Sequence, residues 1–270
     1  MRTQIKNLIL DMDGVLWHGE TALPGLISFF ETLHRLNINF ALATNNATKT
    51  AVMYTEKLAR FGISVPPEKI VTSAEATASY LREEYPNGAR LYTPGTEGLR
   101  TALTAQGFNL ISAEEVRAGA QAAAVVVGFN PHITYHLLAM GAHLINQGAR
   151  FIGTNPDPSF PSEMGQMPGA GALLAFIEAG TGVKPITIGK PEPIMFQQAM
   201  KRLGSTPANT AMVGDRLTTD ILGAKNAGLQ AILVLSGVSK REDIDTQAIA
   251  PDYIFTDISE LAAALAAGTL

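Results

Sequence analysis

The chain has 270 residues, of which 46% are hydrophobic, enough for a sizeable core in one large domain or two smaller ones. Its formal net charge of −4 argues against a nucleic acid partner, and the absence of cysteine excludes disulfides, thiolate catalysis and cysteine-ligated zinc. We find neither a signal-peptide segment nor an apolar run long enough for a bilayer. We therefore expect a soluble cytoplasmic protein without a membrane partner.

Apolar runs and helical periodicities alternate along most of the chain. The first third predicts strands at 5–10 and 38–43 and helices at 25–36, 48–61 and 73–85, with Thr48 as the cap of the second helix. The last third predicts strands at 185–188, 210–213, 230–235 and 253–255 and helices at 193–203, 219–227 and 258–267. Continuous apolar strands separated by helices are typical of an α/β fold with a parallel sheet covered on both faces.

The middle of the chain shows a strand–helix alternation of its own. We expect strands at 89–92, 123–128 and 150–153 and helices at 96–106, 133–147 and 171–179. Residues 156–168 are rich in Pro, Ser, Gly and Met and predict a long loop, of a length that is often functional. The resulting organisation is a discontinuous core domain, 1–81 plus 185–270, with a second α/β domain, 82–184, inserted into it.

Two aspartates stand directly after the first predicted strand. Asp11 and Asp13 are two residues apart, so their side chains point to the same side of an extended segment. Like charges this close resist sharing one site unless a cation is present or one carboxyl holds a proton, and Mg²⁺ prefers such oxygen ligands. The alternative interpretation is a strand that ends in an ordinary Asp-Gly turn. Trp17, shortly afterwards, is expected to serve packing.

Polar residues also follow two other predicted strands. Thr44, Asn45 and Asn46 come after the strand at 38–43, where a hydroxyl and the N–H groups of a helix start can hold an anion. An Asx-turn with a helix cap is the simpler explanation of that segment taken alone. Lys190 lies between glycine and proline after the strand at 185–188 and can neutralise phosphate or carboxylate charge, although a lysine before a helix is usually solvated.

Two more carboxylates follow the strand at 210–213. Asp215 and Asp220 bracket a tight turn into the next helix, and helix capping with dipole complementarity explains one of them better than both. Four strands thus place carboxylates, a lysine and a threonine beyond their carboxyl ends, where ligands bind in an open parallel sheet. Such a set can hold Mg²⁺ and a phosphate and leave one carboxylate free to attack phosphorus.

In this order, the segments resemble the four motifs of the haloacid dehalogenase-type phosphatase superfamily. Further segments are similar to its class IIA, NagD and 4-nitrophenylphosphatase-like subfamily, at residues 13–19, 23–25, 43–50, 153–157, 168–178 and 234–238. The resemblance therefore covers nearly the whole chain. It implies a Rossmann-like core with an inserted α/β cap of the C2 type.

The resemblance also implies a role for each motif residue. Asp11 is expected to be the nucleophile that forms an aspartyl-phosphate. Asp13 is expected to be the general acid and then the general base, and its backbone carbonyl to ligate Mg²⁺. Asp215 is expected to ligate the metal directly, and Asp220 to bind it through water or to orient its shell.

A second group is expected to hold the phosphate and the substrate, namely Thr44, Asn45, Asn46, Lys190, Asn155 and Asp157. Thr44 and Lys190 would contact the phosphoryl oxygens, and Asn45 would do so through its backbone N–H. In the cap, Asn155, Asp157, Phe160 and Met164 are candidates for selecting the leaving group. The alternative is that they are surface-loop residues, with Phe160 packed under the cap.

We therefore expect a Mg²⁺-dependent phosphomonoester hydrolase for small-molecule phosphate esters. Sugar phosphates, nucleoside monophosphates, phosphoglycolate, pyridoxal phosphate and 4-nitrophenyl phosphate all remain open. One alternative is a phospho-receiver-like module without turnover, against which the inserted cap and Asp13 argue. Another is a dinucleotide-binding protein, but no G-x-G-x-x-G follows the first strand. Cap-mediated dimers occur in the family, so a homodimer stays open.

Overall fold

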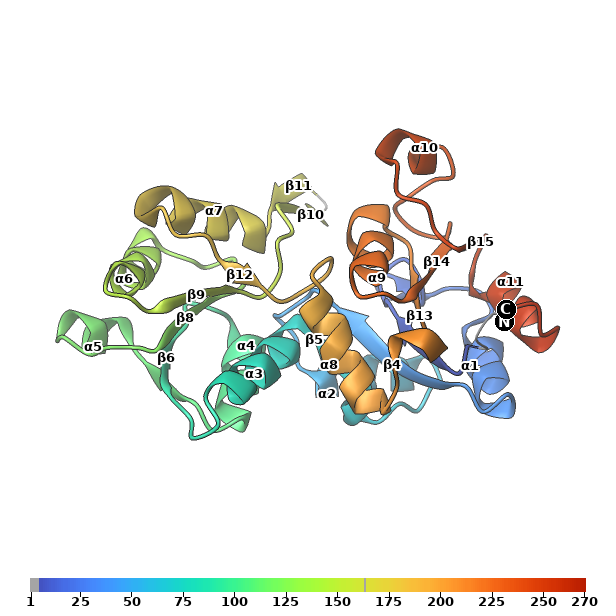
Figure 1. Ribbon diagram of the computed structural model, residues 1–270, viewed down its shortest axis with the longest axis horizontal. Helices are drawn as coiled ribbons and strands as arrows, with labels where there is room; N and C mark the ends of the chain where they lie inside the picture. Colours follow the sequence, from blue (N-terminus) through green and yellow to red (C-terminus); the bar gives the residue numbers. More distant parts are fainter. Residues whose placement is uncertain (1–4, 163) are drawn as a thin grey trace. The chain divides into compact units, whose positions relative to one another are not determined.

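The computed structural model describes residues 5–162 and 164–270, and the chain divides into two compact units (Figure 1). The first unit consists of Met1–Thr44, Ala51–Val71 and Lys190–Leu270, and the second of Asn45–Thr50 and Thr72–Gly189. Residues 1–4, which we predicted to begin the core domain, lie outside the described residues. The chain crosses between the units more than once, so neither unit is a single continuous segment.

The first unit is built on a sheet with the strand order β15-β14-β13-β1-β4-β5. Its strands are β1 (Asn7–Leu10), β4 (Asn39–Thr44), β5 (Ile70–Thr72), β13 (Thr210–Gly214), β14 (Gln230–Val234) and β15 (Tyr253–Phe255). β1 pairs in parallel with both β13 and β4, and β14 pairs in parallel with β13 and β15. The α/β fold with a parallel sheet is therefore confirmed.

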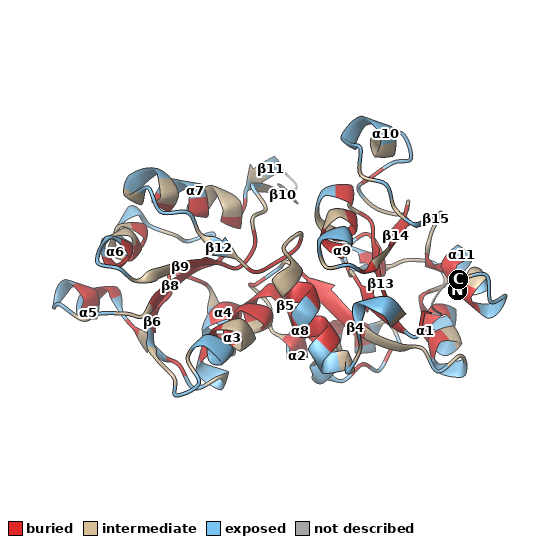
Figure 2. Cartoon of the chain, in the orientation of Figure 1, coloured by how far each residue is buried: buried red, intermediate tan, exposed pale blue. Residues whose placement is uncertain are grey.

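Helices cover both faces of this sheet, because the chain winds outward from β1 in two directions. They are α1 (Leu26–Arg35), α2 (Ala51–Arg60), α8 (Pro193–Leu203), α9 (Leu222–Asn226) and α11 (Ile258–Ala266), whereas α10 (Asp243–Gln247) has no buried residue and does not cover the sheet. Leu8 and Leu10 share one buried cluster with Phe29 of α1 and Leu261 of α11. α8 and α9 pack on β4 and β14, and their buried side chains are not part of this cluster, which places them on the opposite face. In Figure 2 the central strands β1 and β13 are buried, whereas the edge strand β15 is of intermediate burial.

The strand order reverses at β1, and this decides where a ligand site forms. From β1 the chain continues to β4 and β5 on one side, and it later returns to β13 on the other side before it adds β14 and β15. The loops that leave β1 and β13 therefore diverge at their carboxyl ends. A crevice at such a switch point is the usual ligand site of an open α/β sheet.

The second unit has a parallel sheet of its own, with the order β12-β9-β8-β6-β7. Its strands are β6 (Arg90–Tyr92), β7 (Asn109–Ile111), β8 (Ala124–Val127), β9 (Arg150–Gly153) and β12 (Ile186–Thr187). Its helices are α3 (Ser73–Glu84), α4 (Glu97–Ala105), α5 (Ala113–Arg117), α6 (Tyr135–Asn146) and α7 (Ala170–Thr181). Val125 and Val127 pack with Leu138 of α6 and Ile177 of α7 in the core of this unit.

The bounds of the two units differ from the predicted domain bounds. The predicted boundary at residue 82 falls inside α3, which packs on α4 and belongs to the second unit. The strand predicted at 185–188 was assigned to the core sheet, and this assignment is wrong, because β12 pairs with β9 through Ile186 and Ile152. An inserted cap with the predicted bounds, 82–184, stays a prediction.

Two local predictions also need correction, and several short elements were not predicted. Residues 156–168 are more than a loop, since β10 (Ser159–Ser162) and β11 (Gly165–Pro168) form an antiparallel hairpin. The helix predicted from Thr48 begins only at Ala51, because Thr48 instead donates from its backbone N–H and its hydroxyl to Asn46 Oδ1. The small hairpin of β2 (Trp17–His18) and β3 (Thr21–Ala22), together with β5, β7, α5 and α10, was not predicted.

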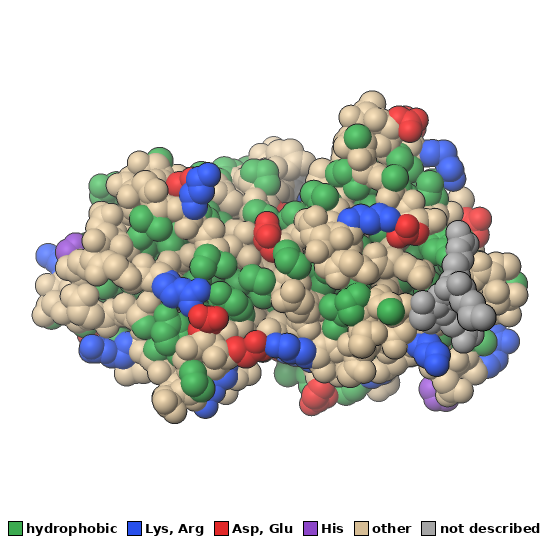
Figure 3. All heavy atoms as spheres, viewed as in Figure 1, with side chains coloured by type: hydrophobic (Ala, Val, Ile, Leu, Met, Phe, Trp, Pro, Cys, Tyr) green, Lys and Arg blue, Asp and Glu red, His purple; other side chains and the backbone are tan. Residues whose placement is uncertain are grey.

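The surface carries charges of both signs. In Figure 3 the Lys and Arg side chains are interspersed with Asp and Glu on the visible face, and hydrophobic side chains lie between them. None of the helices among residues 5–162 and 164–270 combines the length and the apolar character that a membrane crossing needs.

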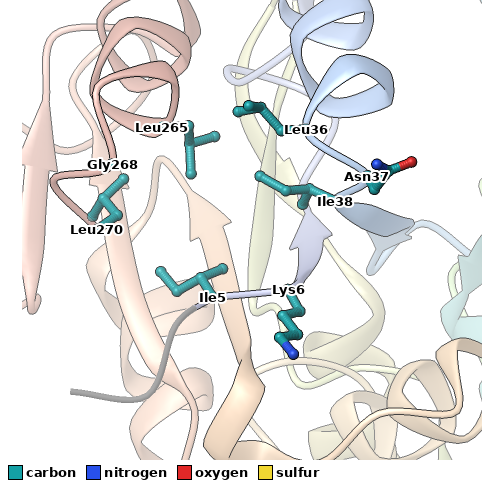
Figure 4. Close-up of a pocket in the computed structure, with 8 residues that line it drawn as sticks. All are labelled: Ile5, Lys6, Leu36, Asn37, Ile38, Leu265, Gly268 and Leu270. Atoms are coloured by element: carbon teal, nitrogen blue, oxygen red, sulfur yellow. The ribbon is translucent and has the colours of Figure 1, made fainter. Parts of the chain in front are cut away.

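A cavity of about 350 Å³ opens at the amino ends of β1 and β4 (Figure 4). Its lining residues are Ile5, Lys6, Leu36, Asn37, Ile38, Leu265, Gly268 and Leu270. The predicted site residues are not among these eight, since they follow the carboxyl ends of the strands. The cavity therefore lies at the edge of the sheet opposite to the switch-point crevice.

Candidate active site

Three carboxylates gather where β1 and β13 end. Asp11 follows β1 directly, and Asp215 follows β13 directly, so neighbouring parallel strands deliver both to one edge. Asp220 lies in the π-helical turn Leu217–Ile221 that leads into α9. One oxygen from each of the three lies within 4.8 Å of the other two. This convergence of the first and fourth motifs is what the strand pattern predicted.

Lys190 joins two of these carboxylates. Its Nζ lies 2.6 Å from Asp11 Oδ1 and 2.6 Å from Asp220 Oδ1, and it also donates to the backbone carbonyl of Ala43 at 3.3 Å. Lys190 and Asp220 are almost fully buried, and Asp11 is 13% exposed. A buried ammonium with three acceptors has little freedom, so Lys190 is a fixed positive charge at this site.

The buried charges shift one another's pKa values. Burial raises the pKa of Asp11 well above its usual value; the charge of Lys190 opposes this, and the charges of Asp220 and Asp215 reinforce it. Burial, followed by the charge of Asp220, raises the pKa of Asp215 to about 6. For Lys190, burial alone lowers the pKa, but the charges of Asp11 and Asp220 outweigh it and raise the pKa. One cation thus compensates three carboxylates only in part.

Backbone N–H groups fix the two carboxylates of the fourth motif. Val238 N donates to Asp215 Oδ2 at 2.7 Å, and Arg216 N donates to Asp220 Oδ2 at 3.0 Å. The tight turn after β13 is closed by Leu217 N, which donates to Ser239 Oγ at 3.0 Å. The segment after β14 therefore supports the site, a contribution that sequence reasoning missed. The composition of this segment does not indicate the contact.

Glycines leave the space that these carboxylates occupy. A Cβ added to Gly214 would collide with the side chain of Asp220, and a Cβ added to Gly14 or Gly237 would collide with that of Asp215. Gly14 also has φ +87°, a conformation that favours glycine over every other residue. The close approach of these three chain segments to the carboxylates of Asp215 and Asp220 thus depends on glycine at the three positions.

Asp13 is exposed and lies apart from the three clustered side chains. Trp17 Nε1 donates to Asp13 Oδ1 at 2.8 Å, and the backbone between them closes a turn in which Gly14 N donates to Trp17 O at 2.8 Å. Trp17 is fully buried, so its predicted packing role is confirmed, but its hydrogen bond to Asp13 was missed. The side chain of Asp13 is not in the carboxylate group, which is consistent with a predicted metal contact through its backbone.

Thr44 ends β4 at the same edge of the sheet and is buried. Its hydroxyl faces the phenol of Tyr54 on α2. Burial raises the pKa of Tyr54, the charges of Asp13 and Asp11 act in the same direction, and the hydrogen bond with Thr44 opposes them. Thr44 and Tyr54 therefore belong to the surroundings of the two aspartates, and Tyr54 is a second residue that sequence reasoning missed.

The remaining predicted binding residues belong to the second unit. Asn155 donates from Nδ2 to Asn45 O at 2.8 Å, and Asn45 donates from Nδ2 to Asp157 Oδ2 at 3.0 Å. Asn155 Oδ1 also accepts from Asp157 N at 3.1 Å. Asn45, Asn155 and Asp157 are therefore hydrogen-bonded to one another, and Asn46 Oδ1 accepts from Thr48. A substrate-binding role for these three residues and Asn46 stays a prediction. Phe160 packs edge-to-face on Phe129 with ring centroids 4.7 Å apart, and both interpretations of Phe160, leaving-group selection and packing under the cap, stay predictions.

The carboxylate cluster suits a hard divalent cation. Asp11, Asp215 and Asp220 offer oxygen ligands within one small volume, and Lys190 compensates only part of their charge. Burial raises the pKa of Asp11 and of Asp215, and a bound cation would favour their charged forms. These residues could therefore hold a metal ion.

We expect the metal-free protein to be less stable at pH 7 than at pH 5. The folded state holds protons on Asp215 up to about pH 6, whereas an unfolded aspartate loses its proton near pH 4, so stability falls as the pH rises between these values. Between pH 5 and pH 7 the loss amounts to roughly 1 kcal/mol for Asp215, because part of the stabilisation by the bound proton is already lost below pH 5. Urea unfolding in EDTA at the two pH values measures it.

Asp215→Asn is the matched control, because it removes the titrating group. Its stability should change less between pH 5 and pH 7 than that of the unchanged protein. Equal pH dependence in the two proteins would show that Asp215 does not titrate as inferred.

Adding a Cβ at Gly237 should disturb the carboxylate of Asp215. Gly237→Ala is expected to lower stability by about 1–3 kcal/mol and to weaken the binding of divalent cations, because the backbone must shift away from Asp215. Gly180→Ala is the control, since Gly180 lies in α7 with open space around it and alanine favours the helix. Thermal unfolding with and without Mg²⁺ tests both. A Gly237→Ala protein that gains as much from Mg²⁺ as the unchanged one would contradict this.

Comparison with known proteins agrees with the fold and the site. Residues 8–109 match the family of haloacid dehalogenase-like hydrolases, and residues 187–261 match a HAD-hydrolase-like family. An acid sugar phosphatase of Staphylococcus aureus (strain USA300) is 41% identical over 262 residues, which are 97% of this chain and 98% of that protein.

Solved structures give the same result. A p-nitrophenyl phosphatase from Archaeoglobus fulgidus has a TM-score of 0.90 and 32% identity, with 97% of this chain and 99% of that chain covered. NagD from E. coli K-12 has a TM-score of 0.86 and 35% identity, with 95% and 98% covered. The chain belongs to the haloacid dehalogenase-like hydrolases. Within them it is a class IIA phosphatase, a phosphoric monoester hydrolase similar to NagD and the 4-nitrophenylphosphatases.

Proposed function

We propose that this chain hydrolyses small-molecule phosphate monoesters with the help of Mg²⁺ and through an aspartyl-phosphate on Asp11. The observation that supports this best is the arrangement around Asp11. Its carboxylate is clamped by Lys190 at 2.6 Å, shares a small volume with Asp215 and Asp220, and lies at the switch point of a parallel sheet. A carboxylate held this way has a fixed direction of attack.

In the first step, an oxygen of the Asp11 carboxylate attacks phosphorus. The bond between phosphorus and the ester oxygen breaks, its electron pair goes to that oxygen, and Asp13 gives the oxygen a proton. In the second step, water attacks the phosphorus of the aspartyl-phosphate and passes a proton to Asp13. The bond from phosphorus to Asp11 then breaks and restores the carboxylate, so the enzyme ends as it began.

Lys190 and Thr44 are the proposed partners of the phosphoryl oxygens. Lys190 is buried and charged beside Asp11, so it offsets the negative charge of the transferring group. Thr44 ends the neighbouring strand β4 and offers a hydroxyl and an N–H. Asp11, Asp215 and Asp220, with the backbone carbonyl of Asp13, would hold Mg²⁺, which would supply positive charge to the phosphoryl oxygens when bound.

The second unit is proposed to act as the cap that selects the substrate. The name of a relative, acid sugar phosphatase, makes sugar phosphates the first candidate substrates, and 4-nitrophenyl phosphate a useful probe. Asn45, Asn46, Asn155 and Asp157 stay candidates for binding the substrate within this proposal. A cytoplasmic location, a homodimer and the lack of nucleic acid and membrane partners also belong to it.

Phosphate release from a panel of small phosphomonoesters tests the proposed function. We expect turnover on at least one sugar phosphate and on 4-nitrophenyl phosphate with Mg²⁺, and none after EDTA treatment, because three clustered carboxylates need the cation. Restoration by added Mg²⁺ is the control for damage by EDTA. Stable uptake of one phosphate per chain without turnover would instead favour the phospho-receiver-like alternative.

A further inference from the structure

Trp17 makes an unusual connection between the core of the first unit and the exposed carboxylate of Asp13. Its side chain is fully buried, yet its indole Nε1 donates to Asp13 Oδ1 at 2.8 Å. Among the residues described, this indole is the one side-chain donor to the Asp13 carboxylate for which the structure gives a hydrogen bond. A buried polar N–H needs a partner, and here the partner is a group at the site.

The ring of Trp17 is held from several sides. It stacks on Tyr54 with centroids 6.4 Å apart and planes inclined by 19°, and it contacts Phe61 at 6.0 Å. The ammonium of Lys57 lies 4.5 Å from its centroid. Tyr54, Lys57 and the neighbouring Leu58 all come from α2, so one helix fixes the plane of the indole. The donor that reaches Asp13 therefore has a defined position and direction.

The backbone adds a second constraint between the same residues. Gly14 N donates to Trp17 O, and Asp13 and Trp17 form an isolated β-bridge. The turn brings the indole back to the carboxylate four residues earlier. An exposed aspartate normally samples several rotamers, whereas this one is tied at Oδ1.

We propose that Trp17 is the positioning residue of Asp13, and that it aims the second carboxylate oxygen at the ester oxygen of the substrate. The inference rests on the proposed function, in which Asp13 protonates the leaving group. With Oδ1 held by the indole, Oδ2 is the oxygen that carries the proton to the leaving group and later accepts one from water. Trp17 itself touches no reacting atom.

The effect must depend on the leaving group. An alkoxide leaves slowly without a proton, so hydrolysis of a sugar phosphate depends on the aim of Asp13. 4-Nitrophenolate leaves readily without one. The ratio kcat/KM reports only the steps up to the release of the alcohol, so it isolates the acid role of Asp13 from its later role as a base.

Trp17→Phe removes the donor and keeps an aromatic ring in the core. We expect kcat/KM for a sugar phosphate to fall about tenfold and kcat/KM for 4-nitrophenyl phosphate to stay within about twofold. Phe61→Leu is the matched control, because it removes one aromatic neighbour of Trp17 while the N–H and the contacts with Tyr54 and Lys57 remain, and it should leave the ratio of the two kcat/KM values unchanged. Equal losses on both substrates with Trp17→Phe would show a structural role only and overturn the proposal.

Asp13→Asn separates this inference from the proposed function. If Asp13 is the acid, Asp13→Asn alone lowers kcat/KM for the sugar phosphate by about 10²-fold or more, and adding Trp17→Phe to it causes little further loss. Full activity of Asp13→Asn would refute the proposed role of Asp13. A normal effect of Asp13→Asn, combined with an additive effect of Trp17→Phe, would refute the positioning role alone.

A direct readout of the hydrogen bond is available because the chain contains a single tryptophan. The ¹⁵N-labelled protein therefore gives one indole N–H resonance, which belongs to Trp17. We expect Asp13→Ala to shift this resonance and to speed its exchange with solvent, while Asp252→Ala, on the surface, leaves it in place. An unchanged resonance in Asp13→Ala would show that the hydrogen bond is not formed.

Discussion

Asp11→Asn is expected to lower phosphate release by about 10⁴-fold or more, the largest effect of any single substitution in this chain. An amide does not attack phosphorus, so the first step is lost. The amide oxygen can still accept from Lys190 Nζ, so the fold should survive. Initial rates on 4-nitrophenyl phosphate with saturating Mg²⁺ measure the loss, and the fluorescence of Trp17 monitors folding.

Asp252→Asn is the control for this experiment. Asp252 also forms an ion pair, with Lys225 at 2.7 Å, but on the surface and far from the motif residues in the sequence. It should keep the activity of the unchanged protein. If Asp11→Asn kept more than about 1% of the rate, a different group would have to be the nucleophile.

Lys190→Met should be the most destabilising substitution at the site in the absence of metal. It leaves the carboxylates of Asp11 and Asp220 buried without their cation, and breaking a buried ion pair in this way costs about 3–5 kcal/mol. The same change should abolish turnover, because the charge beside the nucleophile is lost. Urea unfolding in EDTA, at pH 7 and pH 5, measures the stability.

The pH dependence of this loss has a definite sign. Without Lys190, no ammonium opposes the burial that raises the pKa of Asp11, so the folded state holds a proton on Asp11 more tightly than the unfolded state does and stability falls as the pH rises. The deficit should therefore be smaller at pH 5 than at pH 7. Lys225→Met, which removes a half-exposed surface pair, should cost at most about 1 kcal/mol at either pH. A Lys190→Met deficit as small as that would contradict the inferred role of the buried charge.

The core of the site was predictable from the sequence because parallel strands end at one edge of a sheet. Asp11 follows β1 and Asp215 follows β13, and the two strands are neighbours, so the sequence pattern alone brings these carboxylates together. Lys190 was also placed correctly at the site, although for a partly wrong reason. The short strand before it belongs to the second sheet, and a two-residue strand carries no signal of which sheet it joins.

Other contributions could not be predicted because they depend on tertiary contacts. In the segment after β14, Val238 N donates to the Asp215 carboxylate and Gly237 leaves space for it. The composition of this segment does not indicate that it contacts Asp215. The hydrogen bond from Trp17 to Asp13 depends on the turn between them, whereas an apolar environment already accounts for a buried tryptophan. Sequence patterns predict which face a residue occupies better than which atom it contacts.

The junctions between the two units lie next to the chemistry in the chain. Thr44 is the last residue of one segment of the first unit and Asn45 opens the second unit, while Gly189 closes the second unit and Lys190 resumes the first. Two of the peptide bonds that connect the units are therefore also bonds of proposed phosphate-binding residues. Any insertion, deletion or circular permutation made at these two junctions would change the backbone of Thr44 or Lys190, and so the site itself. Replacing the second unit by another domain at these points would therefore also alter the proposed phosphate-binding site.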